Sequence, residues 1–95
     1  MPIPKKLTIL GHTIKVKRVK VIPKHRHCRG LWLPNKNLIY VQIQPGNVDL
    51  EEQTFYHELV HAILDNLLYI DLSEDEDLVD RVGSALHQAV KTMEY

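Results

Sequence analysis

The chain of 95 residues is long enough for one small domain with a modest hydrophobic core. Hydrophobic residues make up 44% of it and charged residues 25%, a balance typical of globular proteins that excludes the disordered and fibrous classes. Twelve Lys and Arg residues balance twelve Asp and Glu residues, so the net charge gives no reason to expect a nucleic acid or a membrane as partner. Basic residues gather in residues 1–29, which we interpret as solvated strand faces.

The cysteine content and the N-terminal segment indicate the compartment. Cys28 is the single cysteine, so an internal disulfide is excluded and nothing points to an oxidising compartment. The segment MPIPKKLTILGH lacks an apolar run of signal-peptide length, and no stretch approaches the roughly 20 apolar residues of a membrane span. We therefore expect one cytoplasmic domain over residues 1–95.

The first half of the chain predicts strands. Val16, Val19 and Val21 stand among Lys and Arg residues, a near-alternation that favours a half-buried strand with one solvated face, and Pro23 ends it. A turn at Gly11 separates this strand from the one before it. The expected elements are strands at residues 7–10, 14–22 and 38–43, with a possible short strand at Leu31–Leu33 inside the loop of residues 23–37.

A first helix is predicted at residues 50–69. Asp49 has the character of an N-cap, and Glu52 stands three residues later, as in a capping box. On a helical wheel one arc is apolar, as expected for a helix that packs on a sheet. Its members are Tyr56, Leu59, Val60, Ile63 and Leu67.

A second helix is predicted at residues 74–93, with Ser73 as N-cap and Glu76 at the capping-box position. Gly83 lies beside its apolar stripe and leaves room for the two helices to approach closely. Strands followed by helices indicate the α+β class, here a sheet of three to four strands followed by two helices. The stripe consists of Leu78, Val79, Val82, Ala85, Leu86, Ala89, Val90 and Met93.

The stretch FYHELVHAILD carries the pattern His-Glu-x-x-His on the first helix. His57 and His61 lie four residues apart, so both imidazoles reach one helix face and can bind one tetrahedral zinc ion. Glu58 is rotated from His57 by about 100°, which makes it a poor ligand but lets it reach a water molecule at the open position of the metal. There it can act as a general base. The pattern predicts Zn²⁺ as cofactor, with two histidines on the flank of an ordinary helix as the alternative.

HELVHAILD resembles the zinc-binding helix of the gluzincin metallopeptidases, including the Ala after the second His and the Asp four residues beyond it, Asp65. The whole chain also resembles small zincin-like proteins of phages and prophages, with a short sheet, an HExxH helix and a following helix that begins with acidic residues. The resemblance implies a zincin-like fold and peptidase activity, and it places Asp65 around the metal ligands. It also implies that a Glu of the next helix is the third ligand.

Several residues of the second helix are candidates for this third ligand. A metzincin would place it at Leu67, so that family is excluded. With Leu78 at zero on the wheel, the apolar stripe runs from about −20° to 120°, and Glu76 lies just outside it, near 160°. We therefore choose Glu76. Glu76 and Asp80 match the ExxxD spacing of gluzincins, in which the Asp holds a zinc-bound imidazole from behind. Asp80 itself and His87 remain open as alternative ligands.

Two further features concern the substrate. The strand at residues 38–43 directly precedes the first helix, and we expect it to be the edge strand that binds an extended peptide by strand addition. Trp32 either walls this cleft or belongs to the core. A peptidase also benefits from a hydrogen-bond donor to the oxyanion, for which Tyr40, Tyr69 and His87 are candidates that the sequence does not separate.

The loop KHRHCRG holds His25, His27 and Cys28, which we interpret as part of a solvated basic loop rather than as a second metal site. Cys28 has no evident His and Asn partners, so a nucleophilic role is discounted.

Two functions follow. The first is a zinc-dependent peptidase that acts on a peptide or protein substrate, with His57, His61 and Glu76 as ligands and Glu58 as the catalytic base. The second is a zincin-like module without activity, whose metal is structural and which docks a protein partner through the 38–43 strand or, with less support, binds nucleic acid through the basic strands.

Overall fold

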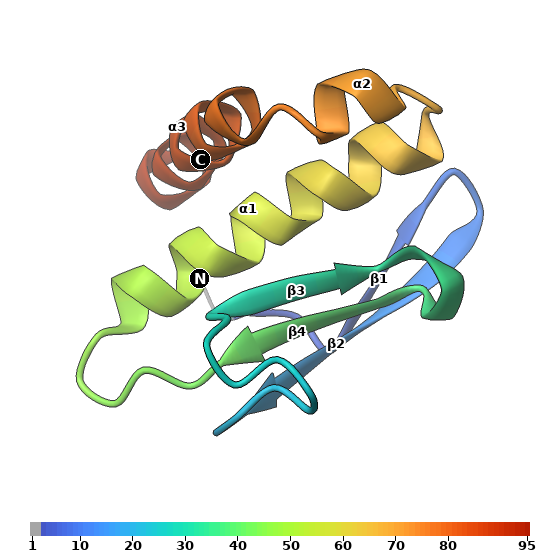
Figure 1. The fold of residues 1–95 in the computed structure, drawn as a ribbon. Helices are drawn as coiled ribbons and strands as arrows, with labels where there is room; N and C mark the ends of the chain where they lie inside the picture. The colour runs from blue at the N-terminus through green and yellow to red at the C-terminus, as the bar shows by residue number, and fades with distance from the viewer. Residues whose placement is uncertain (1–2) are drawn as a thin grey trace.

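The computed structural model describes residues 3–95, and Met1 and Pro2 lie outside the described part. Strands come first and helices follow, so the molecule has the predicted α+β architecture (Figure 1). The elements are β1 (Lys6–Ile9), β2 (His12–Val19), β3 (Gly30–Leu33), the 3₁₀ turn η1 (Pro34–Lys36), β4 (Leu38–Gln42), α1 (Val48–Asn66), α2 (Ile70–Ser73) and α3 (Glu76–Thr92).

The sheet has four strands in the order β1-β2-β4-β3. β1 and β2 form an antiparallel hairpin, β4 runs parallel to β2, and β3 runs antiparallel to β4. The chain turns between β3 and β4 through η1 and Asn37, whose positive φ of 48° suits a tight reversal and is tolerated best by Gly and Asn. β4 is therefore inserted between β2 and β3.

This topology corrects the expectation that residues 38–43 form an edge strand. β4 occupies an interior position, with β2 on one side and β3 on the other, and the edge beside it is β3. Chain order alone led to the wrong assignment, because the strand that directly precedes a helix need not be the outermost one. The long strand predicted at residues 14–22 is also shifted: β2 spans His12–Val19, since its ladder with β4 ends at the pair Val19 and Gln42.

The core lies between the sheet and α1, which crosses the half of the sheet formed by β3 and β4 (Figure 1). α3 packs on α1 from the side away from the sheet. Each fully buried aliphatic side chain in such a core contributes about 1.5–3 kcal/mol through removal from water. The central buried cluster contains Ile14, Val16, Trp32, Ile39, Val41, Phe55, Tyr56 and Ala62.

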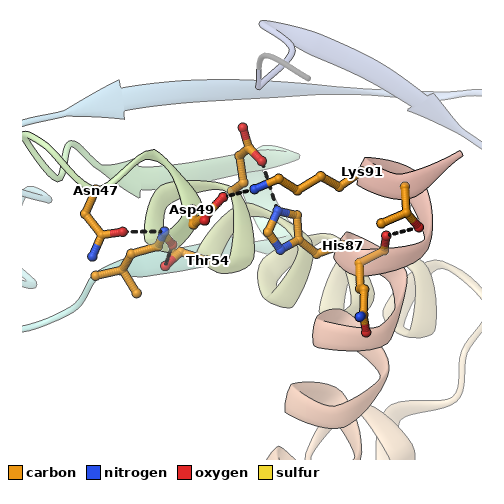
Figure 2. Close-up of polar contacts among 9 residues, drawn as sticks. Asn47, Asp49, Thr54, His87 and Lys91 are labelled. Atoms are coloured by element: carbon orange, nitrogen blue, oxygen red, sulfur yellow. Dashed lines mark hydrogen bonds and ion pairs between the residues drawn. The ribbon is translucent and has the colours of Figure 1, made fainter.

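The start of α1 differs from the prediction. The N-cap is Asn47, whose side-chain oxygen accepts a hydrogen bond from the backbone N–H of Leu50, and not Asp49 (Figure 2). Asp49 lies inside the first turn, where its carboxylate pairs with the ammonium group of Lys91 on α3. This contact lowers the pKa of the Asp49 carboxyl group. Asn and Asp are equally good N-caps, so residue type alone does not decide between positions 47 and 49.

The predicted N-cap of the last helix is also wrong. Asp75 is the N-cap of α3 and accepts a hydrogen bond from the backbone N–H of Leu78. Ser73 instead closes the additional short helix α2, and its side chain is buried. The capping box predicted for Ser73 and Glu76 is therefore not formed, which leaves both side chains available for other contacts.

α3 contacts α1 through the line Val79, Gly83 and His87, the three buried residues of this helix. Val82 and Met93, which belong to the predicted stripe, are exposed. His87 forms a buried contact with Glu52 of α1, with 2.9 Å between Nε2 and Oε1 (Figure 2). No helix in the described part of the chain combines the length and the apolar character that crossing a bilayer requires.

Candidate metal centre

Three side chains converge where the middle of α1 meets the start of α3. His57, His61 and Glu76 each offer one ligand atom, and these atoms all lie within 4.8 Å of one another. Glu76 Oε1 is 2.9 Å from His61 Nε2, and Glu76 Oε2 is 3.5 Å from His57 Nε2. Two imidazole nitrogens and one carboxylate are the donor set of many catalytic zinc sites, which keep the fourth position open. The residues therefore fit a divalent transition metal ion.

Local structure explains this convergence. The four-residue spacing puts both imidazoles on the same face of α1, with ring centroids 5.0 Å apart. Gly83 brings α3 close to them: a Cβ atom at this position would lie 3.0 Å from the Cα atom of His57. Any larger residue at Gly83 would push the helices apart, so the approach predicted from the sequence is present at this glycine.

Behind the imidazoles lie two polar side chains. Asp80 Oδ1 is 3.5 Å from His57 Nδ1, which is the arrangement expected from the ExxxD spacing. His61 Nδ1 is 3.1 Å from the hydroxyl oxygen of Ser73. Each histidine thus directs Nε2 toward Glu76 and has a separate polar group at Nδ1. Asp80, which the sequence left open as an alternative ligand, therefore lies behind His57 and not among the three converging side chains.

Asp65 has a different partner from the one expected of a residue around the metal ligands. Its carboxylate accepts a hydrogen bond from the indole N–H of Trp32, with 2.8 Å between Nε1 and Oδ2. Trp32 is 9% exposed and lines the cleft in front of the histidines, so the two alternatives for this residue, cleft wall and core, both apply. The contact ties β3 to the second half of α1.

Glu58 lies in the same cleft and is buried. Burial, and next the negative charge of Glu76, raise the pKa of its carboxyl group to about 7, against a backbone hydrogen bond from Trp32 that acts in the opposite direction. Gly30 makes this position possible: a Cβ atom there would lie 3.0 Å from Glu58 Oε2 and 2.5 Å from the methyl carbon of Thr54. A carboxyl group that titrates near neutral pH can both accept and return a proton.

The cleft has a volume of about 860 Å³ and is bounded by α1, by the start of α3 and by β3 with the loop that precedes it. His27, Cys28 and Arg29 of that loop line it. The interpretation of the loop as merely solvated is therefore incomplete. His25 is exposed and does not line the cleft, and neither His27 nor Cys28 belongs to a metal-ligand group among residues 3–95.

The three candidates for an oxyanion donor do not lie in the cleft. Tyr40 is on the interior strand β4, and Tyr69 is exposed beyond the end of α1. His87 is buried against Glu52 and is thereby also excluded as the third ligand. A helical wheel could not reveal this, because the buried carboxylate that holds His87 belongs to another helix.

Sequence reasoning also missed two contributors to the site. Gly30 could have been noticed, since a glycine at the start of a strand often marks a close approach of other atoms to the backbone. Ser73 matched the pattern of a helix N-cap, and this pattern gives no indication of its contact with His61. In comparisons with family models, with curated proteins and with solved structures, nothing matches this chain.

Proposed function

We propose that the protein is a zinc-dependent peptidase. The observation that carries the proposal is the presence of two imidazoles, one carboxylate and a buried carboxyl group with a raised pKa in one cleft. His57, His61 and Glu76 would hold the ion, and Glu58 would be the catalytic residue. A zinc ion bound there would supply a Lewis acid that polarises the substrate carbonyl and makes a water molecule more acidic.

The chain's own residues perform the remaining tasks. Glu58, buried in the cleft beside the candidate ligands, accepts the proton of the attacking water and returns it to the amine of the leaving group. Trp32 donates its backbone N–H to the Glu58 carboxylate and its indole N–H to Asp65, so it fixes the wall opposite the ligands. Asp80 orients His57 from behind.

An extended peptide is the substrate shape that suits this cleft. β3 pairs with β4 on one side only. Three of its four residues, Gly30, Leu31 and Trp32, line the cleft. Apart from the Trp32 N–H, which donates to Glu58, its free edge presents backbone N–H and C=O groups that can pair with a substrate strand. This role passes to β3 from the 38–43 strand, which has no free edge.

The experiment compares Glu58→Gln with His57→Ala on a mixture of unstructured peptides, with cleavage followed by mass spectrometry. We expect Glu58→Gln to retain zinc and to lose at least about 100-fold in cleavage rate, because the proton acceptor is removed while the ligands remain. His57→Ala should lose both zinc and activity. Glu74→Gln, which changes an exposed carboxylate outside the cleft, is the control. Undiminished cleavage by Glu58→Gln would contradict the proposal.

A zincin-like module with a structural metal is the second candidate. It is favoured by one observation, namely that Tyr40, Tyr69 and His87 all lie outside the cleft and leave the oxyanion without its expected donors. In that case zinc would stabilise the fold, no peptide would be cleaved with or without the metal, and the edge of β3 would dock a protein partner.

A further inference from the structure

Ser73 contacts the candidate metal centre from an element that the sequence did not predict. It is the last residue of α2, it is 6% exposed, and its backbone N–H donates to the carbonyl of Tyr69. Its hydroxyl oxygen lies 3.1 Å from His61 Nδ1. Within residues 3–95 that hydroxyl has no other hydrogen-bond partner, so the contact with His61 accounts for its orientation.

The two nitrogens of a neutral imidazole have opposite roles, since one carries the proton and the other carries the free electron pair. His61 Nε2 faces Glu76 Oε1 at 2.9 Å, on the side where a metal ion would bind. If Nε2 offers its electron pair, then Nδ1 must carry the proton and needs an acceptor. The Ser73 hydroxyl oxygen is at the right distance to accept it.

We propose that Ser73 is a positioning residue of the metal centre, which holds His61 in the tautomer and ring orientation that direct Nε2 to the ion. His57 has a carboxylate in the equivalent place, Asp80, whereas His61 has a neutral hydroxyl. The short helix α2 thereby has a function, because it turns the chain between α1 and α3 so that Ser73 faces His61. The inference rests on the metal site of the proposed function and holds for a catalytic and for a structural ion alike.

The test measures Zn²⁺ affinity by competition with a chromophoric chelator and records the visible absorption of the Co²⁺-substituted protein. Groups behind metal ligands typically contribute 10–100-fold to metal affinity, so we expect Ser73→Ala to bind zinc about 10-fold more weakly and to change the Co²⁺ spectrum. Ser73→Thr keeps the hydroxyl and should restore both properties. Ser84→Ala, which removes an exposed hydroxyl that lines the same cleft, should change neither.

Thermal unfolding of the zinc-free variants separates a positioning role from a loss of fold. We expect the metal-free Ser73→Ala protein to unfold cooperatively near the parent temperature. Equal zinc affinity in the parent and in Ser73→Ala would overturn the inference, and so would a loss of affinity that Ser73→Thr does not restore. No zinc binding by the parent protein would refute the metal site itself, which is a different result from either of these.

Discussion

Glu58 is the residue on which the proposed chemistry of the cleft depends most. Its carboxyl group is buried between α1 and β3, and burial raises its pKa to about 7. This value belongs to the protein without an ion. A divalent cation held by the neighbouring histidines would stabilise the carboxylate form and lower the pKa again. The ionised Glu58 carboxylate therefore destabilises the metal-free fold at neutral pH. A bound ion would offset this cost through its positive charge.

The pH dependence of stability follows from the direction of this shift. The folded-state pKa lies above the ordinary value of 4.5, so the contribution of Glu58 to stability is complete below about pH 4.5 and is lost as the pH rises through about 7. The shift corresponds to roughly 3 kcal/mol. In chelator-treated samples at pH 8, we expect Glu58→Gln to be more stable than the parent by up to about 3 kcal/mol in urea unfolding.

Well below pH 4.5 the two proteins should have nearly the same free energy of unfolding, because the Glu58 carboxyl group is then protonated in both the folded and the unfolded state of the parent. Glu74→Gln, at an exposed position, should show no such convergence. A difference between the parent and Glu58→Gln that stays constant from pH 4.5 to 8 would mean that the buried carboxyl group does not titrate as described.

The residues of the site were predictable to the extent that they depend on one helix. His57 and His61 follow from the four-residue period. A helical wheel put Glu76 just outside the apolar stripe of the second helix, and the structure brings its carboxylate to the two histidines. Their roles as zinc ligands remain predictions. Ser73 and Gly30 could not be assigned in this way, because their contacts depend on the path of the chain between elements rather than on any local period.

At the scale of elements, the contact between α1 and α3 determines the geometry of the centre. The predicted apolar stripe of α3 was centred near 50° on the wheel, whereas the buried residues Val79, Gly83 and His87 lie between about 100° and 180°. The hydrophobic pattern did not predict this face correctly, because a glycine and a paired histidine are two of its three buried residues. The rotation turns Glu76 and Asp80 toward α1.

Gly83→Ala tests whether this close approach is needed. The added Cβ would meet the Cα and N atoms of His57 at 3.0 and 3.1 Å, and backbone atoms cannot move aside as a flexible side chain can. Ala favours a helix over Gly by about 1 kcal/mol, but overpacking costs roughly 1–3 kcal/mol, so we expect a net loss of up to about 2 kcal/mol. Zinc affinity should fall by at least about 10-fold, since His57 and Glu76 are moved apart.

The control for this substitution is Ser84→Ala, one residue further along the same helix and exposed. Isothermal titration with zinc and urea unfolding measure the two quantities on the same samples. Unchanged zinc affinity in Gly83→Ala would show that the helices can separate without disturbing the ligands.

For the molecule as a whole, the class of fold was predictable and the order of its strands was not. Alternation, turn residues and two helical periods gave strands followed by helices. Whether β3 or β4 forms the edge depends on long-range pairing, and the sequence around residues 38–43 is equally compatible with either position. The consequence for function is direct, because the edge strand is the one that can add a substrate strand.

Metal binding should stabilise the whole fold, because the three candidate ligands join α1 to α3. α3 packs mainly on α1, so the centre would crosslink the outer helix to the helix that covers the sheet (Figure 1). Zinc at a free concentration 100 times its Kd adds about 2.7 kcal/mol, which for a domain of this size raises Tm by roughly 10–20 °C. Differential scanning calorimetry with and without zinc measures the shift, and His57→Ala should show almost none.

The most direct test of the central claim is the metal content of the purified, untagged protein, determined by elemental mass spectrometry beside a variant in which both His57 and His61 are replaced by Ala. We expect about one zinc ion per chain in the parent and none in the variant, since two of the three ligands are gone. If the parent contains no zinc even after zinc is added back, the centre formed by α1 and α3 is not a metal site, and the peptidase proposal fails with it.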